Sequence, residues 1–129
     1  TTELVGSELV RLNYGFRGPP RRLEGVKLNT EQYADFNKLM GTLTNPYNGQ
    51  NLMQALEQTI LDPRYRRTDE AVYDGVNLTR ETKAITEVLS QYRRAARDEV
   101  MRKYPDLWEE VTNRKINDRA GVLLRETNR

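Results

Sequence analysis

The longest regular pattern of apolar residues in the chain runs from Thr79 to Tyr104. Apolar residues recur there every three or four positions, which is the spacing of one face of an α-helix. They are Ile85, Val88, Leu89, Tyr92, Ala96, Val100, Met101 and Tyr104. Thr79 suits the N-cap, because its hydroxyl can accept a hydrogen bond from the first turn. Pro105 ends or bends the helix. The pattern predicts one long central helix over 79–104.

Two shorter helices are predicted before it. The first, over about 30–43, has Asn29 as N-cap and Gln32 at the third position, which is the arrangement of a capping box. Its inner face carries Tyr33, Phe36, Leu39, Met40 and Leu43. The second helix, over about 50–61, ends at Asp62-Pro63. Its inner face carries Leu52, Met53, Leu56 and Ile60.

The segments on either side of the long central helix have a less regular pattern. Ala71–Leu78 is predicted to be a connector with a turn at Asp74-Gly75 and a short extended piece at Ala71–Tyr73. A fourth helix, over about 106–120, opens with Pro105 and an acidic residue suited to the helix dipole. We expect the last residues, 125–129, to be a frayed tail.

Residues 1–28 show no sustained period, and we expect an extended or irregular arm there. Leu4–Leu12 could form a short helix or a strand, and Pro19-Pro20 force extended geometry. The rest of the chain, 29–129, is predicted to be a helical domain. The fold class is therefore all-α: a small helical bundle or array with one long central helix and an irregular extended N-terminal arm.

Composition narrows the possible chemistry. The chain has 129 residues, of which 36% are hydrophobic and 31% charged, so we expect a modest core and a charged surface. The net charge is only +2, so charge over the whole chain does not indicate nucleic acid. There is no cysteine and no histidine, which removes thiol chemistry, the commonest general base and the commonest metal ligand. No apolar run approaches the ~20 residues of a membrane span.

No arrangement of residues predicts catalysis. The neighbouring carboxylates Glu109-Glu110 and Asp98-Glu99 point to different faces of a helix, so they do not form a spaced acid–base pair. Asp69–Gly75 has acids and a glycine but not the spacing of a calcium loop. We therefore predict that the chain is not an enzyme and has no catalytic, cofactor-binding or metal-binding residues. Because it begins at Thr1 without methionine, we expect it to be a piece of a longer protein.

Two basic clusters are the strongest candidates for binding. Five positive residues and one negative residue between Arg11 and Lys27 give the arm a local net charge of +4. The arm could bind phosphate or an acidic partner, or be a solvated loop. On the long helix, Arg93 and Arg97 share a face. They could form a seam to a neighbouring subunit, contact phosphate, or mark a solvated helix end in which Arg94 pairs with Asp98.

Aromatic residues are the other candidates, because tyrosine and tryptophan combine a large buried area with a polar tip. Core packing is the default expectation for Trp108. The residues that we select as candidates for partner binding are Arg21, Arg22, Tyr92, Arg93, Arg97 and Trp108.

Three stretches together resemble a family. They are GVKLNTEQYADFNKLMG (Gly25–Gly41), ILDPRYRR (Ile60–Arg67) and ITEVLSQYRRAARDEVMRKYPDLW (Ile85–Trp108). In order and spacing they resemble a segment near the C-terminal end of large tailed-bacteriophage virion proteins, the tail tape-measure and internal or ejected proteins. The matching positions are Val26, Leu28, Gln32, Tyr33, Gly41, Pro63, Tyr65, Tyr92, Arg93, Ala95, Ala96, Arg97 and Pro105. The likeness covers about 20–108, and 113–129 resembles nothing in that family.

The resemblance implies a structural and assembly module that packs with copies of itself and with other virion proteins of the tail or core. It implies a location in the virion, in the phage tail or capsid interior, with delivery into the host cell envelope as a further expectation. It brings no catalytic residues. The alternative is a nucleic-acid-binding module that uses the arm and helix arginines, in which DNA is the less favoured partner.

Overall fold

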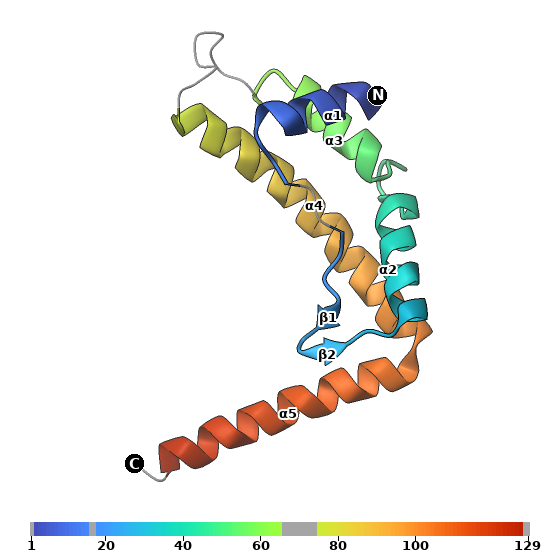
Figure 1. The fold of residues 1–129 in the computed structure, drawn as a ribbon, viewed down its shortest axis with the longest axis vertical. Helices are drawn as coiled ribbons and strands as arrows, with labels where there is room; N and C mark the ends of the chain where they lie inside the picture. Colours follow the sequence, from blue (N-terminus) through green and yellow to red (C-terminus); the bar gives the residue numbers. More distant parts are fainter. Residues whose placement is uncertain (1, 16–17, 66–74, 128–129) are drawn as a thin grey trace.

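The computed structural model describes residues 2–15, 18–65 and 75–127. In these residues the chain forms five helices and one hairpin of two strands. They are α1 (Thr2–Arg11), β1 (Arg22–Leu23), β2 (Val26–Lys27), α2 (Thr30–Thr42), α3 (Leu52–Leu61), α4 (Gly75–Lys103) and α5 (Pro105–Thr127). Helices α2 and α3 pack against α4, and α1 packs on α3 (Figure 1). The predicted all-α array with one long central helix is confirmed.

Helix α4 buries the face that its sequence predicts. Ile85, Leu89, Tyr92, Ala96 and Val100 are buried, and the remaining predicted positions pack partly against the same core. The predicted start is wrong: the helix begins at Gly75, so Thr79 is not its cap. A glycine costs little at a helix terminus, although it costs about 1 kcal/mol in the interior. The extended piece expected at 71–73 lies outside the described residues.

The two short helices begin at matching capping boxes. Asn29 Oδ1 accepts from the amide of Gln32 at 2.8 Å, and the Gln32 side chain accepts from the amide of Asn29 at 2.9 Å. The same exchange joins Asn51 and Gln54 at the start of α3. The predicted cap of α2 is confirmed, and the second box fixes the start of α3 two residues later than expected.

The arm expected over 1–28 is not irregular throughout: of the two alternatives for Leu4–Leu12, the short helix is confirmed. Helix α1 places Val5 in the core, with 1% of its surface exposed. Its pattern is hard to recognise because the inner face also carries a charge, Glu8, which is 6% exposed. Arg11 pairs with Glu8 and with Glu81 of α4. Since a buried charge requires a partner, this helix depends on a residue far away in the sequence.

The rest of the arm turns back on itself and joins the same core. Strands β1 and β2 pair antiparallel, with Leu23 opposite Val26. Glu24 and Gly25 form the turn, and both have positive φ, 50° and 82°, as a two-residue type I′ hairpin turn requires. Leu23, Val26 and Leu28 belong to the same core cluster as α2 and α4. Residues 18–28 are therefore part of the helical body.

Helix α5 leaves the end of α4 at Pro105 and runs back past the hairpin (Figure 1). Leu107 and Val111 are both 2% exposed and hold its first turns against the body. Gly25 lies so close that a β-carbon there would be 2.6 Å from Nε of Arg114. The helix continues to Thr127, past the predicted end at 120 and into the expected tail.

Candidate interaction surface

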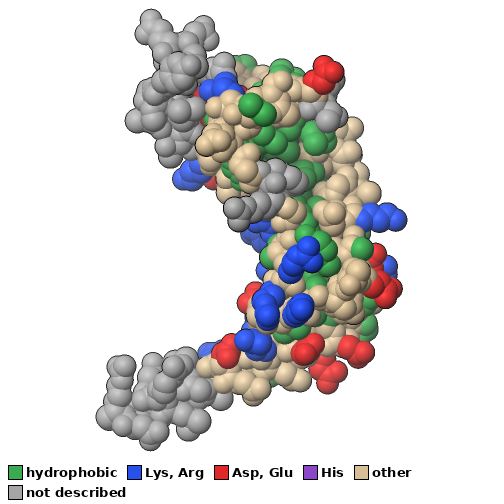
Figure 2. All heavy atoms as spheres, viewed as in Figure 1, with side chains coloured by type: hydrophobic (Ala, Val, Ile, Leu, Met, Phe, Trp, Pro, Cys, Tyr) green, Lys and Arg blue, Asp and Glu red, His purple; other side chains and the backbone are tan. Residues whose placement is uncertain are grey.

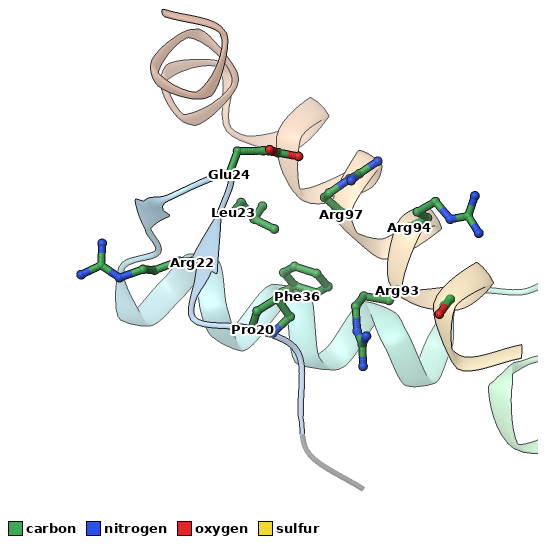
Figure 3. Close-up of a pocket in the computed structure, with 9 residues that line it drawn as sticks. Pro20, Arg22, Leu23, Glu24, Phe36, Arg93, Arg94 and Arg97 are labelled. Carbon is green, nitrogen blue, oxygen red and sulfur yellow. The ribbon is translucent and has the colours of Figure 1, made fainter. Parts of the chain in front are cut away.

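An open pocket of about 320 Å³ lies between the hairpin and α4 (Figure 3). We call it the arginine pocket. Its lining consists of Pro20, Arg22, Leu23, Glu24, Phe36, Ser90, Arg93, Arg94 and Arg97. Four arginines and one glutamate give the lining a net charge of +3. Such a concentration of one sign of charge attracts groups of the opposite sign.

Three elements build this pocket. Phe36 of α2 and Leu23 of β1 form an apolar floor, with 0% and 4% of their surfaces exposed. Arg22 precedes Leu23 in the strand, where successive side chains point to opposite faces. Its guanidinium therefore points away from Phe36 and from the arginines of α4 (Figure 3), and its Nη1 donates to the carbonyl oxygen of Gly25 at 3.2 Å. Arg93 and Arg97 are four residues apart on α4 and therefore rise from the same side of that helix.

The arginines are incompletely neutralised. Nε of Arg93 is buried and has no hydrogen-bond partner among the residues that the structure describes. Nε of Arg97 lies 3.6 Å from Asp98, a contact at the long end of an ion pair. The one acid of the lining, Glu24, lies 3.7 Å from Nζ of Lys115 on α5. Lys115 therefore offsets the acid, and the pocket keeps its positive charge.

The structure brings together three of the predicted site residues and adds a fourth. Arg22, Arg93 and Arg97 line one pocket, although the first is far from the other two in the sequence. Arg94 lines the same pocket. Its pairing with Asp98 was one of the alternatives, and the structure places Asp98 beside Arg97 instead. The adjacent basic residues at 93 and 94 were the signal that could have added Arg94 to the prediction.

Two other predicted residues do not join the pocket. Arg21 is exposed, and its guanidinium carbon lies 4.6 Å from the centre of the Tyr33 ring, a cation–π contact. Tyr92 is 6% exposed, and its hydroxyl donates to the carbonyl oxygen of Gln50 at 2.6 Å. Burial raises the pKa of this phenol. Tyr92 is thus a core residue that holds the segment before α3 against α4. Its selection as a residue for partner binding is corrected.

Trp108 lies on the surface, so the default expectation of core packing is wrong. It is 54% exposed, because Leu107 and Val111 already occupy the side of α5 that faces the body. An open groove of about 480 Å³ at the bend between α4 and α5 is lined by Asp98, Met101, Arg102, Pro105 and Trp108. The groove combines an aromatic side chain with charged neighbours, as interface anchors do.

Between residues 113 and 119, helix α5 carries exposed side chains on every side. Residues 113–119 are all exposed, and Ile116 exposes 60% of its surface. Trp108, Thr112 and Ile116 follow one another at intervals of four, so they lie along one stripe of the helix. We call this the α5 stripe. Nothing in the sequence indicates that Ile116 is exposed.

The first turns of α5 are acidic. Asp106, Glu109 and Glu110 are exposed, and no basic residue occurs between Pro105 and Thr112. Figure 2 shows Lys and Arg gathered on the hollowed side of the molecule, with a group of Asp and Glu at its lower outer corner. The surface therefore has regions of opposite charge.

The surface offers charge and apolar contact. In residues 2–15, 18–65 and 75–127, no helix is both long and apolar enough to cross a bilayer. The same described part of the chain contains no group of three or more acidic side chains placed to hold a metal ion. Comparison of the chain with protein-family models, with curated proteins and with solved structures finds no match.

Proposed function

We propose that this chain is a helical assembly module that acts by packing against other proteins. Following the resemblance described above, its setting is a bacteriophage virion protein of the tail tape-measure or internal ejected kind. Its partners are then neighbouring tail or core proteins and copies of itself. The observation that supports the proposal is the exposure of every residue from 113 to 119 of α5.

An α-helix in water is stabilised mainly by burying one face against other elements. Helix α5 has 23 residues, yet the buried side chains among its described residues are Leu107 and Val111. Past them, the α5 stripe places Ile116 in solvent, with 60% of its surface exposed. A partner that covers the stripe would supply the packing that the chain itself does not give. Trp108 at its start is the type of residue that dominates binding energy at interfaces.

The single tryptophan of the sequence allows a direct test. Because Trp108 is 54% exposed, its fluorescence emission should shift to shorter wavelength when a partner covers it. We expect that shift as the concentration of the chain rises, or when tail or core proteins of the encoding phage are added. Ile116→Asp should prevent it. Leu61→Asp is the matched control, since Leu61 on α3 is equally exposed, at 63%.

Two results would contradict the proposal. One is an emission spectrum that stays the same at every concentration and with every virion protein added. The other is slow hydrogen exchange of the amides of 113–119 in the dilute monomer, because it would show that the helix is stable without a partner. Mass spectrometry of purified particles of the encoding phage tests the location in the virion.

The arginine pocket supports a second candidate, a nucleic-acid-binding module. Its affinity for duplex DNA should fall with salt, with a log–log slope of about −0.9 for each phosphate contact. Arg102, a further arginine near the end of α4, pairs with Glu99 and is therefore less available to phosphate. Fluorescence anisotropy of labelled duplex DNA at low salt, with the wild-type chain, tests this function. No binding would remove it.

A further inference from the structure

The arginine pocket and the first turns of α5 carry matching opposite charges. The pocket has a net charge of +3 from four arginines and Glu24. The first turns of α5 carry Asp106, Glu109 and Glu110, a charge of −3 with no cation among residues 105–112. We call these three residues the acidic turn. Arginine guanidinium groups bind carboxylates through paired, charge-assisted hydrogen bonds, so each surface has the chemistry that the other requires.

The two surfaces do not satisfy each other within one chain. None of the three carboxylates lines the chain's own pocket, where the acid is Glu24. Leu107 and Val111 turn toward the body, and the side chains of the acidic turn are exposed.

The acidic turn also lies beside an apolar anchor. Trp108, 54% exposed, lies between Asp106 and Glu109 in the sequence. The arginine pocket has an apolar floor of Leu23 and Phe36 beneath its charged rim. An interface core that is apolar with polar groups around it is the usual anatomy of a protein–protein contact. A nucleic acid would use the charge of the pocket and would leave the acidic turn unexplained.

We infer that copies of this chain associate head to tail, with the arginine pocket of one copy receiving the acidic turn of the next. The inference rests on the proposed assembly function and adds to it the partner and the contact. Because the two surfaces differ, the contact is heterologous, and it closes into a ring or continues as a filament.

Charge reversal on either side tests the contact in the full chain. The pocket variant is Arg94→Glu with Arg97→Glu, and the helix variant is Glu109→Arg with Glu110→Arg. Arg94 and both glutamates are exposed, which favours folding of the variants, and circular dichroism checks it. The control, Lys38→Glu with Lys83→Glu, reverses the same number of exposed charges outside both surfaces.

Sedimentation velocity at low salt over a concentration series gives the result. We expect the wild type and the control to self-associate, and added salt to reverse it. Each variant alone should associate at least about tenfold more weakly, because like charges then face each other. An equal mixture of the two variants should associate more strongly than either variant alone, because copies that alternate can again pair opposite charges at every contact. Half of these contacts pair the unchanged pocket with the unchanged turn, and the other half pair the two reversed surfaces.

Three outcomes would overturn the inference. The variants could associate as well as the wild type, or their mixture could fail to recover. If either occurs, the proposed function would still be supported by a shift in Trp108 fluorescence that Ile116→Asp abolishes.

The wild type could also be a monomer at every concentration, which excludes self-association. The proposed function would then be tested by the shift in Trp108 fluorescence when other virion proteins are added. Finally, the wild type could be a monomer that binds duplex DNA. If only the pocket variant fails to bind the DNA, the pocket binds phosphate.

Discussion

Helices α4 and α5 follow each other in the chain and differ in what surrounds them. Helix α4 has 29 residues and buries one face, from Ile85 to Val100, against α2 and α3. Helix α5 has 23 residues and is buried only at Leu107 and Val111 in its described part. The two helices are of similar length, but α4 buries more side chains than the described part of α5.

The difference has a cause in the residue pattern. On α4 the apolar residues keep one face over five successive turns, so short helices can cover it. On α5 the face of Leu107 and Val111 continues at Arg114 and Asp118, which are charged and exposed. A charged residue gains nothing from burial without a partner. The comparison teaches that α4 is held by packing within its own chain, whereas residues 113–119 of α5 are exposed in the monomer.

The largest expected effect compares one residue type on the two helices. Ile85 is 0% exposed and Ile116 is 60% exposed. Ile85→Ala should lower the free energy of unfolding by about 3 kcal/mol, because it leaves a cavity in the core. Ile116→Ala should change it by less than about 0.5 kcal/mol in the monomer. Urea unfolding at low protein concentration measures both. Equal losses would mean that α5 is packed within the monomer and would break the comparison.

The next effect compares two arginines. Arg11 joins two carboxylates, Glu8 and Glu81, that are 6% and 2% exposed. Arg11→Ala should cost about 2 kcal/mol, because it leaves buried charges without this partner. Arg94 is exposed on the pocket rim, and Arg94→Ala should cost less than about 0.5 kcal/mol. Thermal unfolding of the two variants distinguishes an arginine used for folding from one that is available for binding. A costly Arg94→Ala would assign that arginine to the fold.

Local rules were enough to predict much of the fold from the sequence. The capping box at Asn29 depends on residues three apart, and the buried face of α4 depends on a spacing within one helix. Both were predictable because every partner is close in the chain. Helix α1 was not, since its inner residue Glu8 is made tolerable by Arg11 and a distant helix. Only the folded chain shows that arrangement.

The candidate site was predictable in its residue types but not in its geometry. The arginines at 93 and 97 share a helix face, which the sequence shows. Their meeting with Arg22 requires a hairpin turn at Glu24 and Gly25 that returns the arm to α4. Tyr92 is buried and Trp108 is exposed. This difference depends on which side of each helix faces a neighbouring element. Residue type alone does not decide that.

Replacing two glycines by alanine should change the free energy of unfolding in opposite directions, because their backbone conformations differ. Gly25 has φ 82° in the hairpin turn, where a β-carbon costs about 1 kcal/mol. Gly25→Ala should therefore destabilise the fold by at least about that amount, because the side chain of Arg114 also has to move away from the added β-carbon. Gly41 lies in α2, where an added β-carbon would meet no atom of the described residues within 4 Å. Gly41→Ala should stabilise by about 0.5 kcal/mol, since alanine favours a helix. Chemical unfolding of both variants tests the signs, and a stabilising Gly25→Ala would contradict the turn.

The smallest effect concerns the junction where α4 ends and α5 begins. The Asp35 carboxylate accepts hydrogen bonds from Nζ of Lys103 at 2.7 Å and from the Tyr104 hydroxyl. Lys103 first and Tyr104 second hold the pKa of Asp35 below its ordinary 3.8. A carboxyl group with a lowered pKa in the folded state stabilises the fold above its ordinary pKa. That stability is lost as the pH falls through the lowered value.

Asp35→Asn should therefore lower the melting temperature at neutral pH, and its difference from the wild type should shrink as the pH falls below 3.8. The hydrogen bond to Asp35 is also the main cause that raises the pKa of Tyr104 to about 12. In the variant, that pKa should fall toward its ordinary 10.0, which absorbance titration of the tyrosines measures. If the difference in melting temperature between the wild type and Asp35→Asn is constant with pH, the negative charge of Asp35 does not contribute to stability. The carboxylate would then not be the group that fixes the end of α4, and the direction in which α5 leaves the body would have to depend on Leu107, Val111 and the hairpin alone.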